Sequence, residues 1–215
     1  MPRELADLPY ARHLRPFEGE PESDMDYESE HLDGVTFADL DAGGVRFGES
    51  AFTAVEFAGG VLRYARFDDV WLRNVRWVGT NLGQSNWLGS EFVDSALSGV
   101  EAVGSQLRRI RFEGCKFDSV NLRNSTLQDV VFAECVLRDT DFGEATLRRV
   151  TFPGSRLEGV ALHGATLHEV DLRGAHTLDL VAGITALKGA TISTPQLMDL
   201  APAFARAAGI IVRDN

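Results

Sequence analysis

The stretch that decides the fold reads LRNVRWVGTNLGQSNWLGSEF and spans residues 72–92. Its large apolar residues fall five apart, at Leu72, Trp77, Leu82, Trp87 and Phe92. The same spacing runs without an insertion through residues 32–172, where 27 of 29 positions hold Leu, Phe or Trp and only Ala42 and Ala102 depart. A repeat this regular decides the architecture before any local propensity does.

Two further positions of each five-residue unit are restricted. The residue two before the large one is small or β-branched in 27 of 29 units. The residue two after it is Gly in 12 units and Asn or Asp in seven more. These residue types tolerate a positive φ or hydrogen-bond to their own backbone in a turn. Each unit therefore predicts one small and one large inward residue, followed by a corner.

A period of five fits neither a helix nor a strand, so the chain is expected to turn a corner every five residues and stack on itself. The pattern resembles the pentapeptide-repeat family, whose loose consensus is A(D/N)LXX. The matching pairs and triplets include Asn121–Leu122, Ala145–Leu147 and Asp171–Leu172. The resemblance implies an all-β solenoid, a right-handed quadrilateral β-helix of about seven coils and roughly 34 Å, with a short C-terminal helix.

Charge and composition divide the chain into three parts. Residues 1–30 have a net charge of −6 and are expected to be an acidic N-terminal arm, partly disordered over 18–29. Residues 31–178 are the predicted β-helix, and 179–215 hold the end of the last coil, a helix and a short strand. The whole chain carries −11 and has no basic patch. Phosphate contacts need cations, so direct nucleic-acid binding is not expected.

The N-terminal arm is expected to cover the open first coil, because a solenoid end exposes unpaired strand edges. Tyr10, Leu14 and Phe17 are the predicted capping contacts. The arm has no apolar leader and the chain no membrane-spanning run, so a cytoplasmic location is expected. Cys115 and Cys135 occupy the small inward position one coil apart. They are interpreted as reduced core residues and not as a disulfide or metal site.

No catalytic or cofactor motif occurs in the sequence, so no enzyme activity, cofactor or metal is expected. Binding must then use the exterior. Trp71 is expected to be an exposed outward tryptophan, a residue type favoured at interfaces. Four carboxylates accompany it on the same predicted wall as candidate partner-binding residues: Glu91, Asp94, Glu113 and Glu134. No wall is a continuous acidic stripe.

The C-terminal segment predicts a helix over about residues 195–208. Thr194 suits the N-cap, Pro195 suits the first helical position, and Pro202 is expected to kink or split the helix. Residues 210–212 predict a short strand. This ending resembles that of the Qnr and MfpA fluoroquinolone-resistance branch of the family, in which the C-terminal element forms a head-to-head dimer. The implied dimer interface comprises Leu197, Leu200, Phe204, Ala208, Ile210 and Ile211. The alternative is a monomer in which the helix only covers the last coil.

Two functions remain open from the sequence. Resemblance to the Qnr and MfpA branch, on the side that lacks loop insertions, implies a dimeric acidic rod. Such a rod mimics duplex DNA, binds DNA gyrase or topoisomerase IV, and protects it from quinolones or other inhibitors. The alternative is a structural or adaptor module that binds another protein through its apolar middle wall or acidic arm. A fold shared by many functions does not choose between them.

Overall fold

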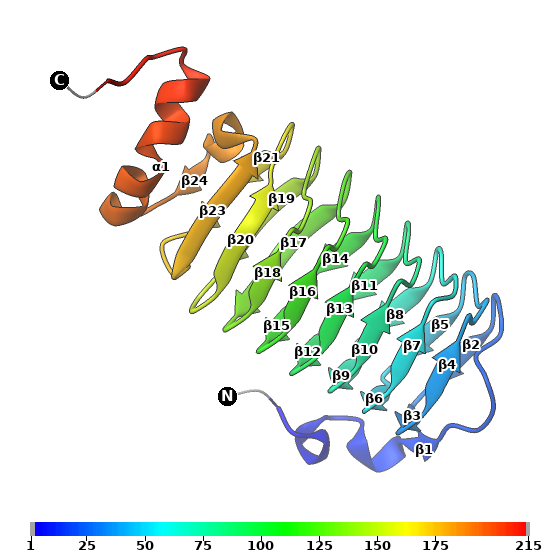
Figure 1. The fold of residues 1–215 in the computed structure, drawn as a ribbon. Coiled ribbons are helices and arrows are strands. Elements are labelled where there is room, and N and C mark those ends of the chain that lie inside the picture. Colours follow the sequence, from blue (N-terminus) through cyan, green and yellow to red (C-terminus); the bar gives the residue numbers. More distant parts are fainter. Residues whose placement is uncertain (1–2, 214–215) are drawn as a thin grey trace.

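The computed structural model describes residues 3–213, which form a parallel β-solenoid with a helix at its C-terminal end (Figure 1). Each strand pairs with the strand one turn on, so that Phe92 lies beside Phe112, a shift of 20 residues. Four five-residue units therefore complete one turn, and the predicted four-sided coil is confirmed. We number the faces of the coil from the first to the fourth in chain order.

The first face lies against the N-terminal segment in Figure 1. Its strands are β1 (Arg15–Pro16), β3 (Glu30–Asp33), β6 (Ala51–Thr53), β9 (Trp71–Arg73), β12 (Glu91–Val93), β15 (Arg111–Glu113), the end of β17 (Thr126–Ala133), the end of β19 (Thr146–Thr151), β22 (Val170–Asp171) and β24 (Ala190–Thr191). The second face is a sheet of 8 strands. They are β4 (Thr36–Ala38), β7 (Glu56–Ala58), β10 (Arg76–Val78), β13 (Ala96–Ser98), β16 (Lys116–Asp118), β18 (Val136–Arg138), β20 (Arg156–Ala161) and β23 (Thr177–Ala182).

The third face is joined by isolated parallel bridges, such as Asn81 with Glu101, in place of strands. The fourth face contains β2 (Asp26–Glu28), β5 (Arg46–Gly48), β8 (Arg66–Asp68), β11 (Asn86–Leu88), β14 (Gln106–Arg108), the starts of β17 and β19, and β21 (Thr166–His168). The corner residues between the faces adopt positive φ, as Asp69 does at 53° and Gly89 at 65°. This conformation explains why glycine, aspartate and asparagine recur there.

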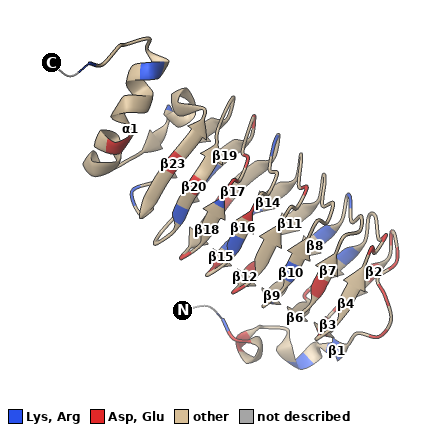
Figure 2. Cartoon of the chain, in the orientation of Figure 1, with Lys and Arg blue, Asp and Glu red and all other residues tan. Residues whose placement is uncertain are grey.

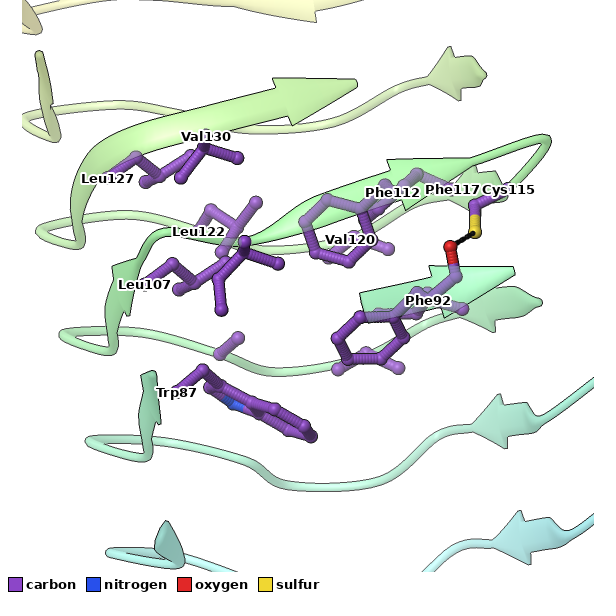
Figure 3. Packing of buried hydrophobic residues seen from close by; sticks show 14 of the residues in the cluster. Trp87, Phe92, Leu107, Phe112, Cys115, Phe117, Val120, Leu122, Leu127 and Val130 are labelled. Atoms are coloured by element: carbon purple, nitrogen blue, oxygen red, sulfur yellow. Dashed lines mark hydrogen bonds between the residues drawn. The ribbon is translucent and has the colours of Figure 1, made fainter. Parts of the chain in front are cut away.

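The core is the predicted column of large side chains. All 29 repeat positions from Leu32 to Leu172 belong to one buried cluster. Rings in successive turns stack face to face, with centroids 5.0 Å apart for Phe112 and Phe132 and 5.1 Å apart for Phe132 and Phe152. Neighbouring faces meet edge on, as Phe112 does with Phe117. Figure 3 shows how side chains from opposite walls converge on the axis.

The solenoid has about eight turns over the described residues where the sequence predicted about seven, because strand pairing extends both before residue 31, at β2, and after residue 178, at β23 and β24. Strand β2 lies within the segment expected to be disordered, and Tyr27 stacks on Phe47 with ring centroids 5.1 Å apart. Tyr27 already stands five residues before Leu32. Phe17 closes this end by packing edge-on against Tyr27 at 5.2 Å, as expected for a cap. The prediction was wrong for Tyr10 and Leu14, which pack on the outside of the first face and not over the open coil.

The C-terminal helix α1 (Thr194–Ala207) follows a short 3-10 turn, η3 (Ile184–Leu187), and differs from prediction in three details. Ser193, and not Thr194, is its N-cap, in a capping box with Gln196. Pro202 lies inside one continuous helix, because Leu200 and Phe204 on either side pack on the last coil. Residues 210–212 form no strand, since no neighbouring strand pairs with them.

Ala102 leaves a cavity of about 30 Å³ on the solenoid axis, where most repeats place a large side chain. Trp87, Leu97, Leu107 and Phe112 line the same space. The cavity lies in the layers drawn in Figure 3. Ala42 stands in the same column, yet it is fully shielded at 0% exposure, whereas Ala102 is 8% exposed toward the cavity.

Filling this cavity should stabilise the protein. We expect Ala102→Val to raise the free energy of unfolding by roughly 0.5–2 kcal/mol, because two methyl groups enter empty apolar space. Ala42→Val is the matched control and should lower it by roughly 1–3 kcal/mol through overpacking. Thermal and denaturant unfolding of both variants measures the difference. A loss of stability in Ala102→Val would show that the space beside Ala102 cannot hold two further methyl groups.

Candidate interaction surfaces

The axis is filled with apolar side chains, so any binding surface must lie on the exterior or at the two ends. The sequence placed Trp71, Glu91, Asp94, Glu113 and Glu134 together on one wall. The structure does place all five on or beside the first face, on β9, β12, β15 and the corners that follow β12 and β17. Their surroundings differ from one to the next.

Trp71 is not exposed, which corrects the prediction. Its side chain is 2% exposed because residues 3–14 cross the first face over β6, β9 and β12 (Figure 1). We call this segment the N-terminal strap. It contains two single turns of 3-10 helix, η1 (Leu5–Asp7) and η2 (Ala11–His13). Leu8 and Tyr10 of the strap form a buried cluster with Ala51, Trp71 and Val93, separate from the main core.

Glu91 is also covered by the strap and is only 4% exposed. Its carboxylate accepts from the Arg3 side chain, with Nε 2.6 Å from Oε2, and from the Arg3 backbone N–H at 3.2 Å. A second ion pair joins Glu4 of the strap to Arg73 of β9. The strap therefore attaches to the wall through one apolar cluster and two ion pairs. Glu91 and Trp71 are not available on the free surface.

The three remaining carboxylates are accessible but do not form a continuous stripe. Glu113 is half-buried and paired with Arg111 on the same strand. Asp94 and Glu134 are exposed corner residues, two turns and roughly 10 Å apart. Each lies over a glycine of the next turn. A Cβ built on Gly114 would be 2.7 Å from Asp94 Oδ1, and one on Gly154 would overlap the Glu134 carboxylate.

Acidic residues outnumber basic ones in the N-terminal half of the fourth face, which the sequence did not predict as a site (Figure 2). Arg46 there pairs with Asp26 at 3.0 Å, whereas no ion pair holds the other four acids among the described residues: Glu28, Glu49, Asp68 and Asp69. Burial raises the pKa of Glu28, and the neighbouring charges of Glu49 and Asp68 raise it further. Burial and then Asp69 likewise raise the pKa of Asp68, which Arg66 opposes.

The C-terminal half of this face is basic. It carries Arg108, Arg109, Arg148 and Arg149 in two turns separated by one. Arg149 donates to Asp129 through Nε and Nη2, at 2.9 Å for the second contact. This hydrogen bond is the main cause that lowers the pKa of Asp129. The rod is therefore not uniformly acidic, despite its net charge of −11.

The proposed dimer residues at the C-terminal end divide into two groups. Leu200 is 5% exposed, and Phe204 is partly buried; both pack on the last coil and act as a cap. Gln196 assists by donating from Nε2 to the carbonyls of Leu172 at 2.8 Å and Ala175 at 3.1 Å. The others face solvent: Leu197 at 47%, Ile210 at 60% and Ile211 at 77% exposure, together with Ala208.

The family model described as "Pentapeptide repeat region" matches residues 87–162 and 105–180. This part of the chain, residues 87–180, is a pentapeptide-repeat region. This confirms the family predicted from its five-residue period, while the assignment to the Qnr and MfpA branch stays a prediction. None of the curated proteins matches the sequence.

Solved pentapeptide-repeat structures resemble this one. HetL, involved in heterocyst differentiation regulation in the cyanobacterium Nostoc, is 16% identical with a TM-score of 0.40, over 80% of this chain and 84% of that chain. QnrB1, a plasmid-mediated fluoroquinolone resistance protein, is 15% identical with a TM-score of 0.39, over 84% and 99%. A pentapeptide repeat protein from the Arabidopsis thaliana thylakoid lumen is 25% identical with a TM-score of 0.43, over 49% and 73%.

The two cysteines of this pentapeptide-repeat rod lie as predicted, buried, unbonded and stacked one turn apart. Cys115 Sγ lies 3.5 Å from the Phe92 carbonyl oxygen, the contact drawn in Figure 3. Within residues 3–213, no group of three or more His, Cys, Asp or Glu side chains is placed to hold a metal ion. No helix in this part of the chain is long and apolar enough to cross a membrane.

The acidic half of the fourth face predicts a measurable pH effect. A carboxylate with a raised pKa destabilises the fold above that pKa, so Glu28→Gln should raise the melting temperature at neutral pH. The gain should vanish below roughly pH 4, where Glu28 is protonated in both states. Glu56→Gln is the control with equal charge change, because Glu56 pairs with Arg76 at 3.4 Å. An equal rise in melting temperature for both variants, or a rise for Glu28→Gln that persists at low pH, would contradict a destabilising charge on Glu28.

Proposed function

We propose that this protein is a non-catalytic protein-binding rod that acts through its exterior. The observation that carries the proposal is the filled axis, which places every repeat side chain of the inward column in one buried cluster. Small-molecule sites in proteins are usually concave pockets with a few convergent polar groups. In this protein the accessible surfaces are the long outer faces of the solenoid and its two ends. Surfaces of this shape suit a macromolecular partner.

The partner that we propose to test first is a type II topoisomerase, DNA gyrase or topoisomerase IV. The net charge of −11 and the unbroken coils support this choice, as does the sequence resemblance to the Qnr and MfpA branch. The exposed carboxylates Asp94 and Glu134 are the candidate contacts on the first-face edge. The covered Glu91 and the paired Glu113 weaken any mimicry of evenly spaced phosphates.

The topoisomerase proposal predicts inhibition of DNA supercoiling by gyrase at micromolar protein, or rescue of gyrase from ciprofloxacin. Asp94→Lys combined with Glu134→Lys should abolish the effect, because basic side chains would then face the enzyme. Asp41→Lys combined with Asp118→Lys changes the net charge equally on other faces and should retain it. No effect of the unmodified protein on supercoiling or on ciprofloxacin inhibition would exclude topoisomerase and leave an adaptor role.

The C-terminal end is the proposed homodimer contact. Exposed Leu197, Ile210 and Ile211 form an apolar end that a second copy could cover, while Leu200 and Phe204 hold the helix on its own coil. An adaptor with two identical arms would follow from such an end-to-end dimer.

Ile211→Asp should therefore convert a dimer to a folded monomer in sedimentation velocity. Its melting temperature should match that of the monomeric state, because Ile211 is 77% exposed and contributes little to the fold. Met25→Asp is the control at the opposite end, where Met25 is 48% exposed. A monomeric parent protein, or a dimer that survives Ile211→Asp, would show that α1 serves only as the cap.

A further inference from the structure

The N-terminal strap covers a patch of apolar residues on the outside of the first face. Trp71, Val93 and Ala51 point outward from the coils, yet they are buried by Leu8 and Tyr10 of the strap. We call these wall residues, together with Glu91, the Trp71 patch. A tryptophan packed in a fully desolvated apolar pocket is typical of the centre of a protein–protein interface.

The strap is held to the patch by side-chain contacts and by one backbone N–H, that of Arg3, which donates to the Glu91 carboxylate. All backbone hydrogen bonds made by residues 3–14 as donors to other backbone groups stay within the strap, such as Leu8 to Leu5 and His13 to Tyr10. Pairing with the coils begins only at β1, where the Arg15 N–H donates to the Ser29 carbonyl at 2.9 Å. The strap can therefore leave the wall without breaking any sheet pairing, with β1 as a fixed pivot.

The hydrogen bonds between the strap and the patch are also incomplete. The indole N–H of Trp71 is buried without a hydrogen-bond acceptor. The Tyr10 hydroxyl donates to the Ser50 carbonyl only at 3.4 Å. A buried donor without a partner is unfavourable, so an occupant that supplied an acceptor to Trp71 would bind more favourably.

A cavity of about 170 Å³ remains beside the strap. It is lined by Arg3, Pro9, Tyr10, Glu49, Asp69 and Gly89. Glu49 and Asp69 have no ion-pair partner among residues 3–213, although Arg3 lines the same space. The cavity is therefore negatively charged and large enough for a further basic side chain.

We propose that the Trp71 patch is a binding site for a short segment of a partner protein, and that the strap is its internal competitor. The occupant that fits carries Arg or Lys opposite Glu91 and, about five to seven residues on, two large apolar side chains. Those are the spacings of Arg3, Leu8 and Tyr10. A second basic residue next to the apolar pair fits the space between Glu49 and Asp69. This inference rests on the proposed protein-binding role but on no particular partner.

The test uses a fluorescent peptide with the sequence RELADLPYARHLRP, which is that of residues 3–16. The full chain should bind it weakly, because its own strap competes at a high effective concentration. The full chain with Leu8→Asp and Tyr10→Asp has a detached strap and an intact patch, and should bind the peptide roughly tenfold or more tightly. Adding Glu91→Gln to that chain should remove most of this gain.

Two peptide variants report on the chemistry of the site. Replacing Arg3 of the peptide by Glu should weaken binding, because Glu91 loses its cation. Replacing Pro9 of the peptide by Lys should strengthen binding at low salt and lose that advantage at high salt, because its ammonium enters the cavity beside Glu49 and Asp69. Peptide affinity that is indifferent to both changes would overturn the proposed specificity.

Detachment is followed separately by acrylamide quenching of Trp71, with a Trp71→Phe chain to subtract the two axial tryptophans. Quenching should rise when the strap is detached and fall again when the peptide is added. If the double variant loses its β-sheet signal, Arg3→Glu in the full chain replaces it, with a smaller rise expected. Persistent shielding of Trp71, or no peptide binding by the detached chain, would overturn the proposal. Neither readout uses topoisomerase, so this inference and that of a topoisomerase partner can fail independently.

Discussion

The fold depends on the registration of each turn over the one before it. The large side chain of every five-residue unit must meet its counterpart 20 residues away, and the parallel backbone hydrogen bonds follow from that contact. Stacked pairs such as Phe112 and Phe132 fix the register, because a slip by one residue would turn the column outward. Nothing in this arrangement requires a metal or disulfide. The small axial cavity at Ala102 is lined almost wholly by apolar side chains.

This regularity explains why the repeat and its core could be predicted so completely from the sequence. Inward and outward positions follow directly from the period, so the spacing of Cys115 and Cys135 was enough to predict that both are buried one turn apart. Tyr27 shows that the five-residue period extends one unit further toward the N-terminus than the sequence prediction placed it. Tyr27 stands five residues before Leu32, but the acidic residues around it favoured the prediction of a disordered segment.

The exterior was less predictable, because the period says which way a side chain points but not what lies on top of it. Trp71 and Glu91 point outward as expected and are nevertheless covered. The signal that could have found the strap was a match between two sets: Leu5, Leu8, Tyr10 and Leu14 in the arm, and Ala51, Trp71 and Val93 on one wall. Likewise, the apolar stripe of α1 could not show that Leu200 and Phe204 face their own coil while Ile211 faces solvent.

The acid-over-glycine corners make some turns a better match for their neighbours than others. Asp94 Oδ1 lies in the space that a Cβ at position 114 would need, so any side chain there would have to displace the Asp94 carboxylate. A second copy of residues 94–113 placed directly after the first would set one aspartate beneath another, as Glu49 and Asp69 already stand. Lengthening such a rod, by recombination or by design, should therefore disturb the corners least where an acidic corner is inherited together with the glycine 20 residues downstream.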